Sequence, residues 1–229
     1  MSISRRFVLK GMALGSSVSL AAGIPIGALA DAIATSTGTG PDLMLLVNVT
    51  AAEPAFLQGA MAAGSTRLQV QRVSQDLDLD FILALEHRMR VGALRIIGLL
   101  DDASATLVVD MARSAGARVQ WLGQHSVAPG FAHHRLLTTD SVGGCARQFG
   151  DELQAAGAGF SLYEERLSNT MTPRQLSGPS RRGDQSAQWA ATLGYLLASP
   201  GPHTSTMVPD VPAASVTVTG RFVSFSIEA

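Results

Sequence analysis

The chain has 229 residues, of which 46% are hydrophobic and 15% are charged, and its formal net charge is −1 at pH 7. This balance is typical of a folded globular protein and excludes an intrinsically disordered chain. The charge offers no net basic surface to nucleic acid, and Cys145, the only cysteine, excludes an internal disulfide bond.

The first thirty residues combine the three parts of an export signal. The sequence SRRFVLK at residues 4–10 supplies adjacent arginines and a later lysine. Residues 11–30 are uncharged, rich in Gly, Ser and Ala, and end in ALA, which suits cleavage by a signal peptidase. Residues 31–41 are small and polar, which predicts a flexible leader before the folded part.

This segment resembles a twin-arginine (Tat) signal, the class that directs folded proteins across the bacterial inner membrane. The resemblance implies passage through the Tat translocase, removal of residues 1–30, and a periplasmic or secreted mature protein with no membrane span after cleavage. Two other interpretations stay open. An ordinary signal can carry adjacent arginines by chance, and the segment is long enough to remain as an uncleaved anchor.

The first half of the remaining chain alternates apolar strands with amphipathic helices. Strands are predicted at residues 43–49, 67–73, 94–100 and 118–122, with helices between them at residues 52–63, 78–91 and 102–115. Successive strands begin about 25 residues apart, the length of a β-helix-β unit, which favours parallel strands.

The second half is less regular. It predicts a short strand at residues 134–138, a helix at 143–156, a strand at 160–163, a long loop at 165–183, a helix beginning at 184, and terminal strands at 216–218 and 222–227. We expect residues 42–229 to form a single α/β domain with a mainly parallel, doubly wound sheet. The layering would be Rossmann-like or flavodoxin-like, with the C-terminal strands as an antiparallel edge.

Ligands of open α/β sheets bind beyond the carboxyl ends of the strands. That rule selects five candidate ligand-binding residues, namely Asn48, Thr50, Asp101, Asp102 and Gln124. The two aspartates could ligate a divalent cation or a hydroxyl-rich ligand. Alternatively, Asp102 caps the following helix and Asp101 is solvated in the turn.

Three histidines and the cysteine are candidate catalytic residues. His125, His133 and His134 fall in one expected loop, where imidazoles could act as acid, base or metal ligand. Their spacing matches no compact metal motif, so solvated histidines are the alternative. Cys145 follows two glycines at a helix start, a position that favours a reactive thiolate, although a buried and inert cysteine is the alternative.

No known cofactor motif accompanies these residues. The chain has neither a Gly-x-Gly-x-x-Gly turn after the first strand nor a Walker loop, and it has no Gly-x-Ser-x-Gly elbow. The sequence therefore identifies no cofactor or metal. It favours a ligand-binding or accessory protein of a Tat-exported system, which could travel with a co-exported enzyme subunit. The alternative is a hydrolase-like or metal-dependent enzyme with a site in residues 101–134.

Overall fold

The computed structural model describes residues 42–48, 50, 52–64, 68–73, 78–142, 144–167, 172–181, 187–199, 208 and 218–229. The expected signal at residues 1–30 and the leader at 31–41 lie outside this part of the chain. So do residues 216–217 of the expected terminal strands.

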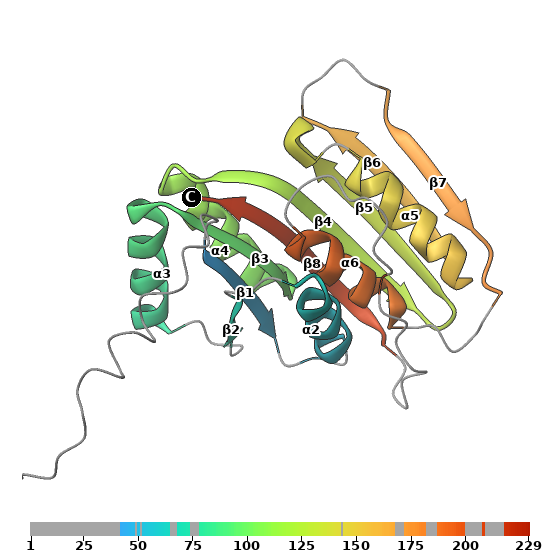
Figure 1. The fold of residues 1–229 in the computed structure, drawn as a ribbon, viewed down its shortest axis with the longest axis horizontal. Helices are drawn as coiled ribbons and strands as arrows, with labels where there is room; N and C mark the ends of the chain where they lie inside the picture. The colour runs from blue at the N-terminus through green and yellow to red at the C-terminus, as the bar shows by residue number, and fades with distance from the viewer. Residues whose placement is uncertain are drawn as a thin grey trace, which may run out of the picture. The chain divides into compact units, whose positions relative to one another are not determined.

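Eight strands form one sheet in the order β2-β1-β3-β8-β4-β5-β6-β7 (Figure 1). Their bounds are β1 Asp42–Asn48, β2 Leu68–Val73, β3 Leu94–Leu100, β4 Arg118–Ala128, β5 Phe131–Thr138, β6 Phe160–Arg166, β7 Arg174–Gly178 and β8 Gly220–Glu228. β1 pairs in parallel with β2 and β3, and β5 pairs in parallel with β6. The pairs β3–β8, β8–β4, β4–β5 and β6–β7 are antiparallel. The fold is therefore α/β with a mixed sheet in which antiparallel pairs outnumber parallel ones.

Two expectations about this sheet are wrong. The sheet is not mainly parallel, and its C-terminal strand is not at an edge, because β8 lies between β3 and β4 and runs antiparallel to both. β3 and β4 consequently point the same way, as their spacing predicts, but they do not pair. The spacing of helix-linked strands says nothing about a distant strand that inserts between them. The expected long loop at residues 165–183 is also wrong in part, since β7 lies within it.

Helices cover both faces of the sheet unequally (Figure 1). Helices α2 Glu53–Ala62, α5 Cys145–Ala156 and α6 Gln188–Ala198 pack on one face. Helices α3 Leu79–Val91 and α4 Asp102–Ser114 pack on the other, against β1, β3 and β8. No described helix covers the outer part of that second face, which is formed by β4, β5, β6 and β7. We call this part the open face.

Helix α6 is the centre of the larger core. All eleven of its residues are buried, so the helix is enclosed around its whole circumference. It approaches α2 closely because Gly59 and Gly194 face the partner backbone, and a Cβ at either position would collide with it. Arg95 of β3 donates from Nη1 to Ser199 O at 3.1 Å and from Nη2 to Leu197 O at 2.8 Å, which satisfies carbonyls at the end of α6. Among the described helices, none has both the length and the apolar character needed to span a membrane.

Candidate functional site

All three candidate histidines lie on the β4–β5 hairpin rather than in a loop. β4 ends at Ala128 and β5 begins at Phe131, so Pro129 and Gly130 alone form the turn. Gly130 has φ = 74°, and proline followed by a glycine with positive φ is the pattern of a type II turn. The expectation of a loop around His125 and His133 is therefore wrong, because these residues are paired along two long strands.

Strand geometry separates the histidines onto two faces of the sheet. Successive side chains of a strand point to opposite faces, and exposure along residues 123–136 alternates accordingly. His125 and His134 point into the core under α5 and α6, each 2% exposed. Their rings lie against Trp189 and Phe149, at centroid distances of 5.1 Å for His125–Trp189 and 5.0 Å for His134–Phe149. His133 points to the open face.

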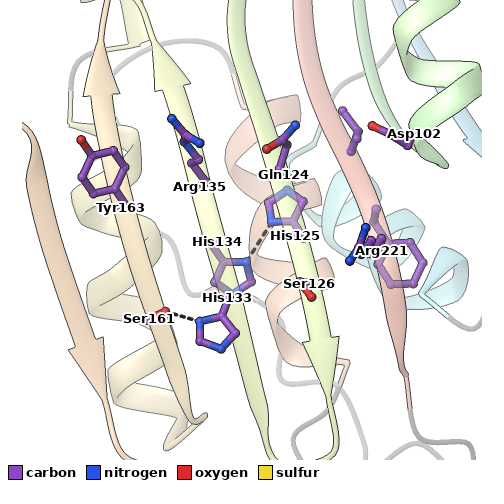
Figure 2. A pocket seen from close by; sticks show the side chains of 12 residues that line it. Asp102, Gln124, His125, Ser126, His133, His134, Arg135, Ser161, Tyr163 and Arg221 are labelled. Atoms are coloured by element: carbon purple, nitrogen blue, oxygen red, sulfur yellow. Dashed lines mark hydrogen bonds between the residues drawn. The ribbon is translucent and has the colours of Figure 1, made fainter.

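The buried histidines belong to a hydrogen-bonded chain across three strands. Trp121 Nε1 donates to Ser224 Oγ at 2.9 Å, and that hydroxyl lies 2.7 Å from His125 Nε2. His125 Nδ1 in turn lies 2.8 Å from His134 Nδ1 (Figure 2). One proton between the two Nδ1 atoms completes the chain, so one imidazole donates and the other accepts.

Burial fixes the charge state of this pair. Burial lowers the pKa of His125 from 6.5 to about 3. Burial also lowers the pKa of His134 well below its usual value, and proximity to His125 and His133 lowers it further. Within the described residues, His134 Nε2 has no hydrogen-bond partner. Both rings are thus neutral at physiological pH and lie away from solvent, which makes them structural groups of the core rather than exchangeable acids or bases.

Side chains form two rows across the open face and the adjoining strand β8, and all of them are polar except the buried Val223. The strand pairing aligns the first row as Arg221, Ser126, His133, Ser161 and Ser177, running from β8 through β4, β5 and β6 to β7. The second row, two residues along each strand, consists of Val223, Gln124, Arg135, Tyr163 and Gln175. Neighbouring strands lie about 4.8 Å apart, so each row spans roughly 19 Å.

A groove of about 440 Å³ lies over these rows, and Asp102 at the start of α4 also lines it. Figure 2 shows Asp102 beside the Arg221 end and Tyr163 at the opposite end. The Arg135 guanidinium lies 5.9 Å from the centre of the Tyr163 ring, within cation–π range. Neither Arg135 nor Arg221 makes an ion pair with a described carboxylate. The charged side chains of the groove are thus two arginines and one aspartate, which favours a negatively charged ligand.

Other polar groups of the groove are already ordered. His133 Nδ1 lies 2.7 Å from Ser161 Oγ on the adjacent strand. The aromatic ring of Phe131, the next outward residue of β5, lies 4.9 Å from the His133 ring. Strand backbone and cross-strand contacts therefore hold these side chains in place before any ligand arrives.

The candidates at the ends of β1 and β3 are structural. Asn48 Oδ1 accepts from the backbone N–H of Asp101 at 2.6 Å, and Asn48 Nδ2 donates to Val73 O at 3.4 Å. The backbone carbonyl of Thr50 accepts from the N–H of Glu53, the first residue of α2. These contacts join the ends of three strands, and the groove is not lined by Asn48, Thr50 or Asp101.

Asp101, and not Asp102, caps helix α4. Asp101 Oδ1 accepts from the backbone N–H of Ser104 at 2.9 Å, and Oδ2 accepts from its hydroxyl at 2.7 Å. Burial acts to raise the pKa of Asp101, but the hydrogen bonds from Ser104 outweigh it, so the pKa lies below its usual value. Because Asp101 performs the capping, the Asp102 carboxylate remains exposed toward the groove.

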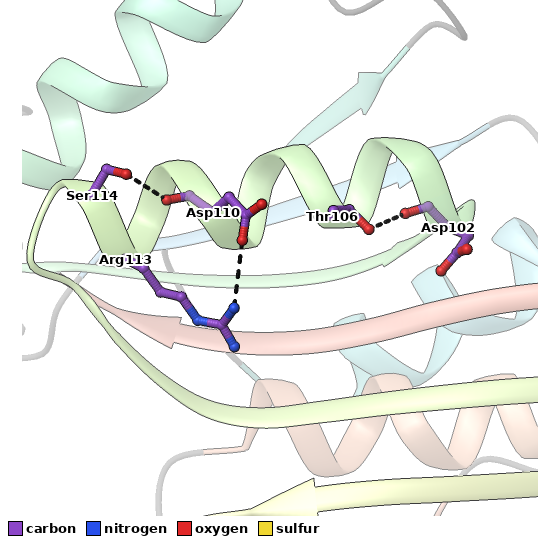
Figure 3. Close-up of polar contacts among 5 residues, drawn as sticks. All are labelled: Asp102, Thr106, Asp110, Arg113 and Ser114. Atoms are coloured by element: carbon purple, nitrogen blue, oxygen red, sulfur yellow. Dashed lines mark hydrogen bonds and ion pairs between the residues drawn. The ribbon is translucent and has the colours of Figure 1, made fainter.

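Figure 3 shows how the rest of α4 satisfies its polar groups locally. Thr106 Oγ1 donates to the carbonyl of Asp102 at 2.7 Å, and Ser114 Oγ donates to the carbonyl of Asp110 at 2.9 Å. Arg113 Nη1 lies 3.4 Å from Asp110 Oδ1. The charges farther along α4 are thus paired within the helix, unlike Asp102.

Cys145 begins α5 and is partly buried. Burial raises its thiol pKa; nearby Arg95 acts to lower it, and Glu164 raises it again. The position of Cys145 at a helix N-terminus predicts a lowered thiol pKa, but the net change is an increase. A thiol in this environment is mostly protonated at neutral pH, which disfavours a nucleophilic role.

No group of three or more His, Cys, Asp or Glu side chains within the described ranges is arranged to hold a metal ion. Comparison of the chain with protein-family models, curated proteins and solved structures found no match.

Of the candidates, Asp102, Gln124, His125, His133 and His134 line the groove, although the rings of His125 and His134 point into the core. The groove is also lined by residues that the sequence analysis did not select, namely Ser126, Arg135, Ser161, Tyr163, Arg221, Phe222 and Val223. The alternation of polar and apolar residues along 124–136 and 160–165 could have placed Arg135, Ser161 and Tyr163 on a solvent-facing surface. No local signal could have placed Arg221 beside them, because that depends on where β8 inserts.

We expect the buried histidine pair to make stability depend on pH. In the unfolded chain these histidines bind protons below about pH 6.5, whereas the folded state resists protonation, down to about pH 3 for His125. The free energy of unfolding should therefore be highest above about pH 7. It should fall with decreasing pH by at most about 1.4 kcal/mol per pH unit for each histidine. Urea unfolding between pH 8 and pH 4.5 measures this slope.

The double substitution His125→Gln and His134→Gln should flatten the slope between pH 6.5 and pH 4.5, because amides do not titrate there. If that variant does not fold, NMR of the wild-type rings provides the check. Ring signals of His125 and His134 that shift as a protonation step between pH 8 and pH 6 would contradict the assignment.

Proposed function

We propose that this protein binds a small anionic ligand in the groove on the open face. The observation that carries the proposal is the pair of guanidiniums, Arg135 and Arg221, which are exposed in one groove and unpaired with any described carboxylate. Arginine forms charge-assisted, often bidentate hydrogen bonds with carboxylate and phosphate groups. The volume of the groove, about 440 Å³, lies within the usual range for small-molecule sites.

The surroundings of the two arginines support binding of a small molecule rather than of a polyanion. Asp102 places a negative charge in the same groove, so every additional negative charge on the ligand would meet repulsion there. The whole chain has a formal charge of −1 and offers no long-range attraction to nucleic acid. A ligand with one or two anionic groups and a neutral polar body fits best.

The proposed place of action follows from residues 1–30, which resemble a Tat signal. We propose that the protein folds in the cytoplasm, crosses the inner membrane through the Tat translocase, and acts in the periplasm or outside the cell. There it would serve as a ligand-binding or accessory protein, beside a co-exported enzyme subunit if one is present.

A hydrolytic function is a second candidate, favoured by the 2.7 Å contact between His133 Nδ1 and Ser161 Oγ. In that reaction His133 would accept the proton as Ser161 attacks an ester carbonyl, and would return it to the leaving alkoxide. His133 would then take a proton from a water molecule that attacks the acyl-serine, and would return it to the Ser161 oxygen as the acid leaves. Arg135 in the adjacent row would stabilise the oxyanion.

Hydrolysis of p-nitrophenyl acetate tests this second function. Ser161→Ala should abolish turnover if Ser161 is the nucleophile. Ser177→Ala, in the same row one strand further out, should leave turnover unchanged. Equal rates for the wild type and Ser161→Ala would exclude the hydrolytic function.

The binding function predicts that Arg135→Ala and Arg221→Ala each weaken an anion by about tenfold or more. A hydrogen bond to a charged group contributes roughly 1.5–3 kcal/mol, and 1.4 kcal/mol corresponds to a factor of ten. Calorimetric titration with a panel of small carboxylates and phosphate measures the loss. Arg147→Ala is the matched control, because Arg147 is exposed on α5 at the opposite face and pairs with Asp151 at 3.6 Å. Anion affinity that is unchanged in both groove variants, or reduced equally in the control, would contradict the proposal.

The proposed export route predicts that replacing Arg5 and Arg6 together with lysine blocks transport, because the Tat pathway depends on the arginine pair. Fractionation of cells followed by immunoblotting should then show the full-length chain in the cytoplasm. Lys10→Arg keeps the charge outside the pair and should be exported normally. Unchanged processing of the double-lysine variant would indicate an ordinary signal, and an unprocessed chain in the membrane fraction would indicate an anchor.

A further inference from the structure

The two ends of the groove differ in charge. Arg135 lies on β5 beside Tyr163. The one carboxylate among the groove-lining residues, that of Asp102, lies at the opposite end of the groove. At that end, Asp102 and Arg221 of β8 line the same side of the groove (Figure 2). β8 and β5 are separated by β4, so the two arginine-bearing strands lie about 10 Å apart. A single anionic group is therefore best placed at Arg135, whereas the mixed-charge end suits neutral hydroxyl groups that can both donate and accept.

The middle of the groove is neutral but rich in hydrogen-bonding groups. Gln124 and Ser126 face it from β4, and the His133–Ser161 pair faces it from β5 and β6. A ligand that removes water from these groups must replace the lost hydrogen bonds, because unpaired polar groups are costly. A chain of hydroxyl groups does so. The methylene body of an acidic amino acid does not, and a polyphosphate would set additional negative charge against Asp102.

Aromatic rings lie at the Arg135 side of the groove and beyond it. Tyr163 and Phe131 are 37% and 36% exposed on the open face, so part of each ring is accessible to a ligand. Their apolar faces can pack against the C–H groups of a sugar ring. Phe131 stands next to His133 along β5, so it would meet a second sugar unit attached to the one in the groove.

From this layout we propose that the ligand is a sugar acid, a pyranose ring that carries one carboxylate. The inference rests on the proposed anion-binding function and names the ligand class of the same groove. The carboxylate binds Arg135, the ring hydroxyls bind Gln124 and Ser126, and a ring face packs on Tyr163. The same chemistry occurs in a free uronic acid and in the terminal unit of an acidic polysaccharide.

Calorimetric titration of the full chain with five probes tests the proposal, namely D-galacturonate, D-galacturonate tetramer, D-galactose, L-glutamate and acetate. We expect galacturonate or its tetramer to bind at least tenfold more tightly than every other probe. Preference for the tetramer would assign the ligand to a polysaccharide, and equal or tighter binding of the monomer would assign it to the free acid.

Two variants distinguish the contact to the carboxylate from the contacts to the sugar hydroxyls. Arg135→Ala should remove the preference for galacturonate over galactose, whereas Gln124→Ala should weaken both sugars by a similar factor. Glutamate or acetate binding as tightly as galacturonate, with Arg135 still required, would overturn the sugar-acid inference and leave the anion-binding function standing. Absence of any anion binding that depends on Arg135 would overturn both.

Discussion

The insertion of β8 between β3 and β4 is the constraint on which the rest of the structure depends. β8 pairs with β3 over Val223–Glu228 and with β4 over most of its length, and it is the only strand of the described residues that joins the two halves of the sheet. On its inner face, Ser224 connects Trp121 to His125. On its outer face, Arg221 and Val223 line the groove. The last residues of the chain thus complete both the core and the candidate site.

The local elements of the first half could be predicted, because continuous apolar runs identify buried strands and their spacing implies helical connections. The position of β8 could not, because strand order is decided by contacts between residues more than a hundred positions apart. Ser224 and Ser226 alternate with apolar residues, a pattern that predicts a half-exposed strand, yet both are buried. For Ser224, the hydrogen bonds to Trp121 and His125 remove the cost of burying the hydroxyl.

The candidate site was predictable only in part, for a related reason. The two-residue period of the β4–β5 hairpin can be recognised only if histidine is counted as a core residue, because His125 and His134 occupy core positions. The sequence neighbours His133 and His134 consequently lie on opposite faces of one strand and have unrelated roles. Register then decides the composition of the groove, since Arg221, Ser126 and His133 become neighbours only through the pairing of three strands.

A sheet face without a covering helix must be polar to remain in water, so polar rows alone do not identify a site. The pairing of charges provides a sharper criterion. Several exposed arginines elsewhere pair with carboxylates, as in Arg90 with Glu86 at 2.6 Å and Arg113 with Asp110 at 3.4 Å. Arg118 and Arg181 are also exposed without a carboxylate partner among the described residues, but neither lines the groove. Arg135 and Arg221 have no such partner among the described residues, although Asp102 lies in the same groove. Solubility in water requires charged side chains on this face, but it does not require two positive charges beside ordered hydrogen-bonding groups. A bound anion would neutralise this excess of positive charge.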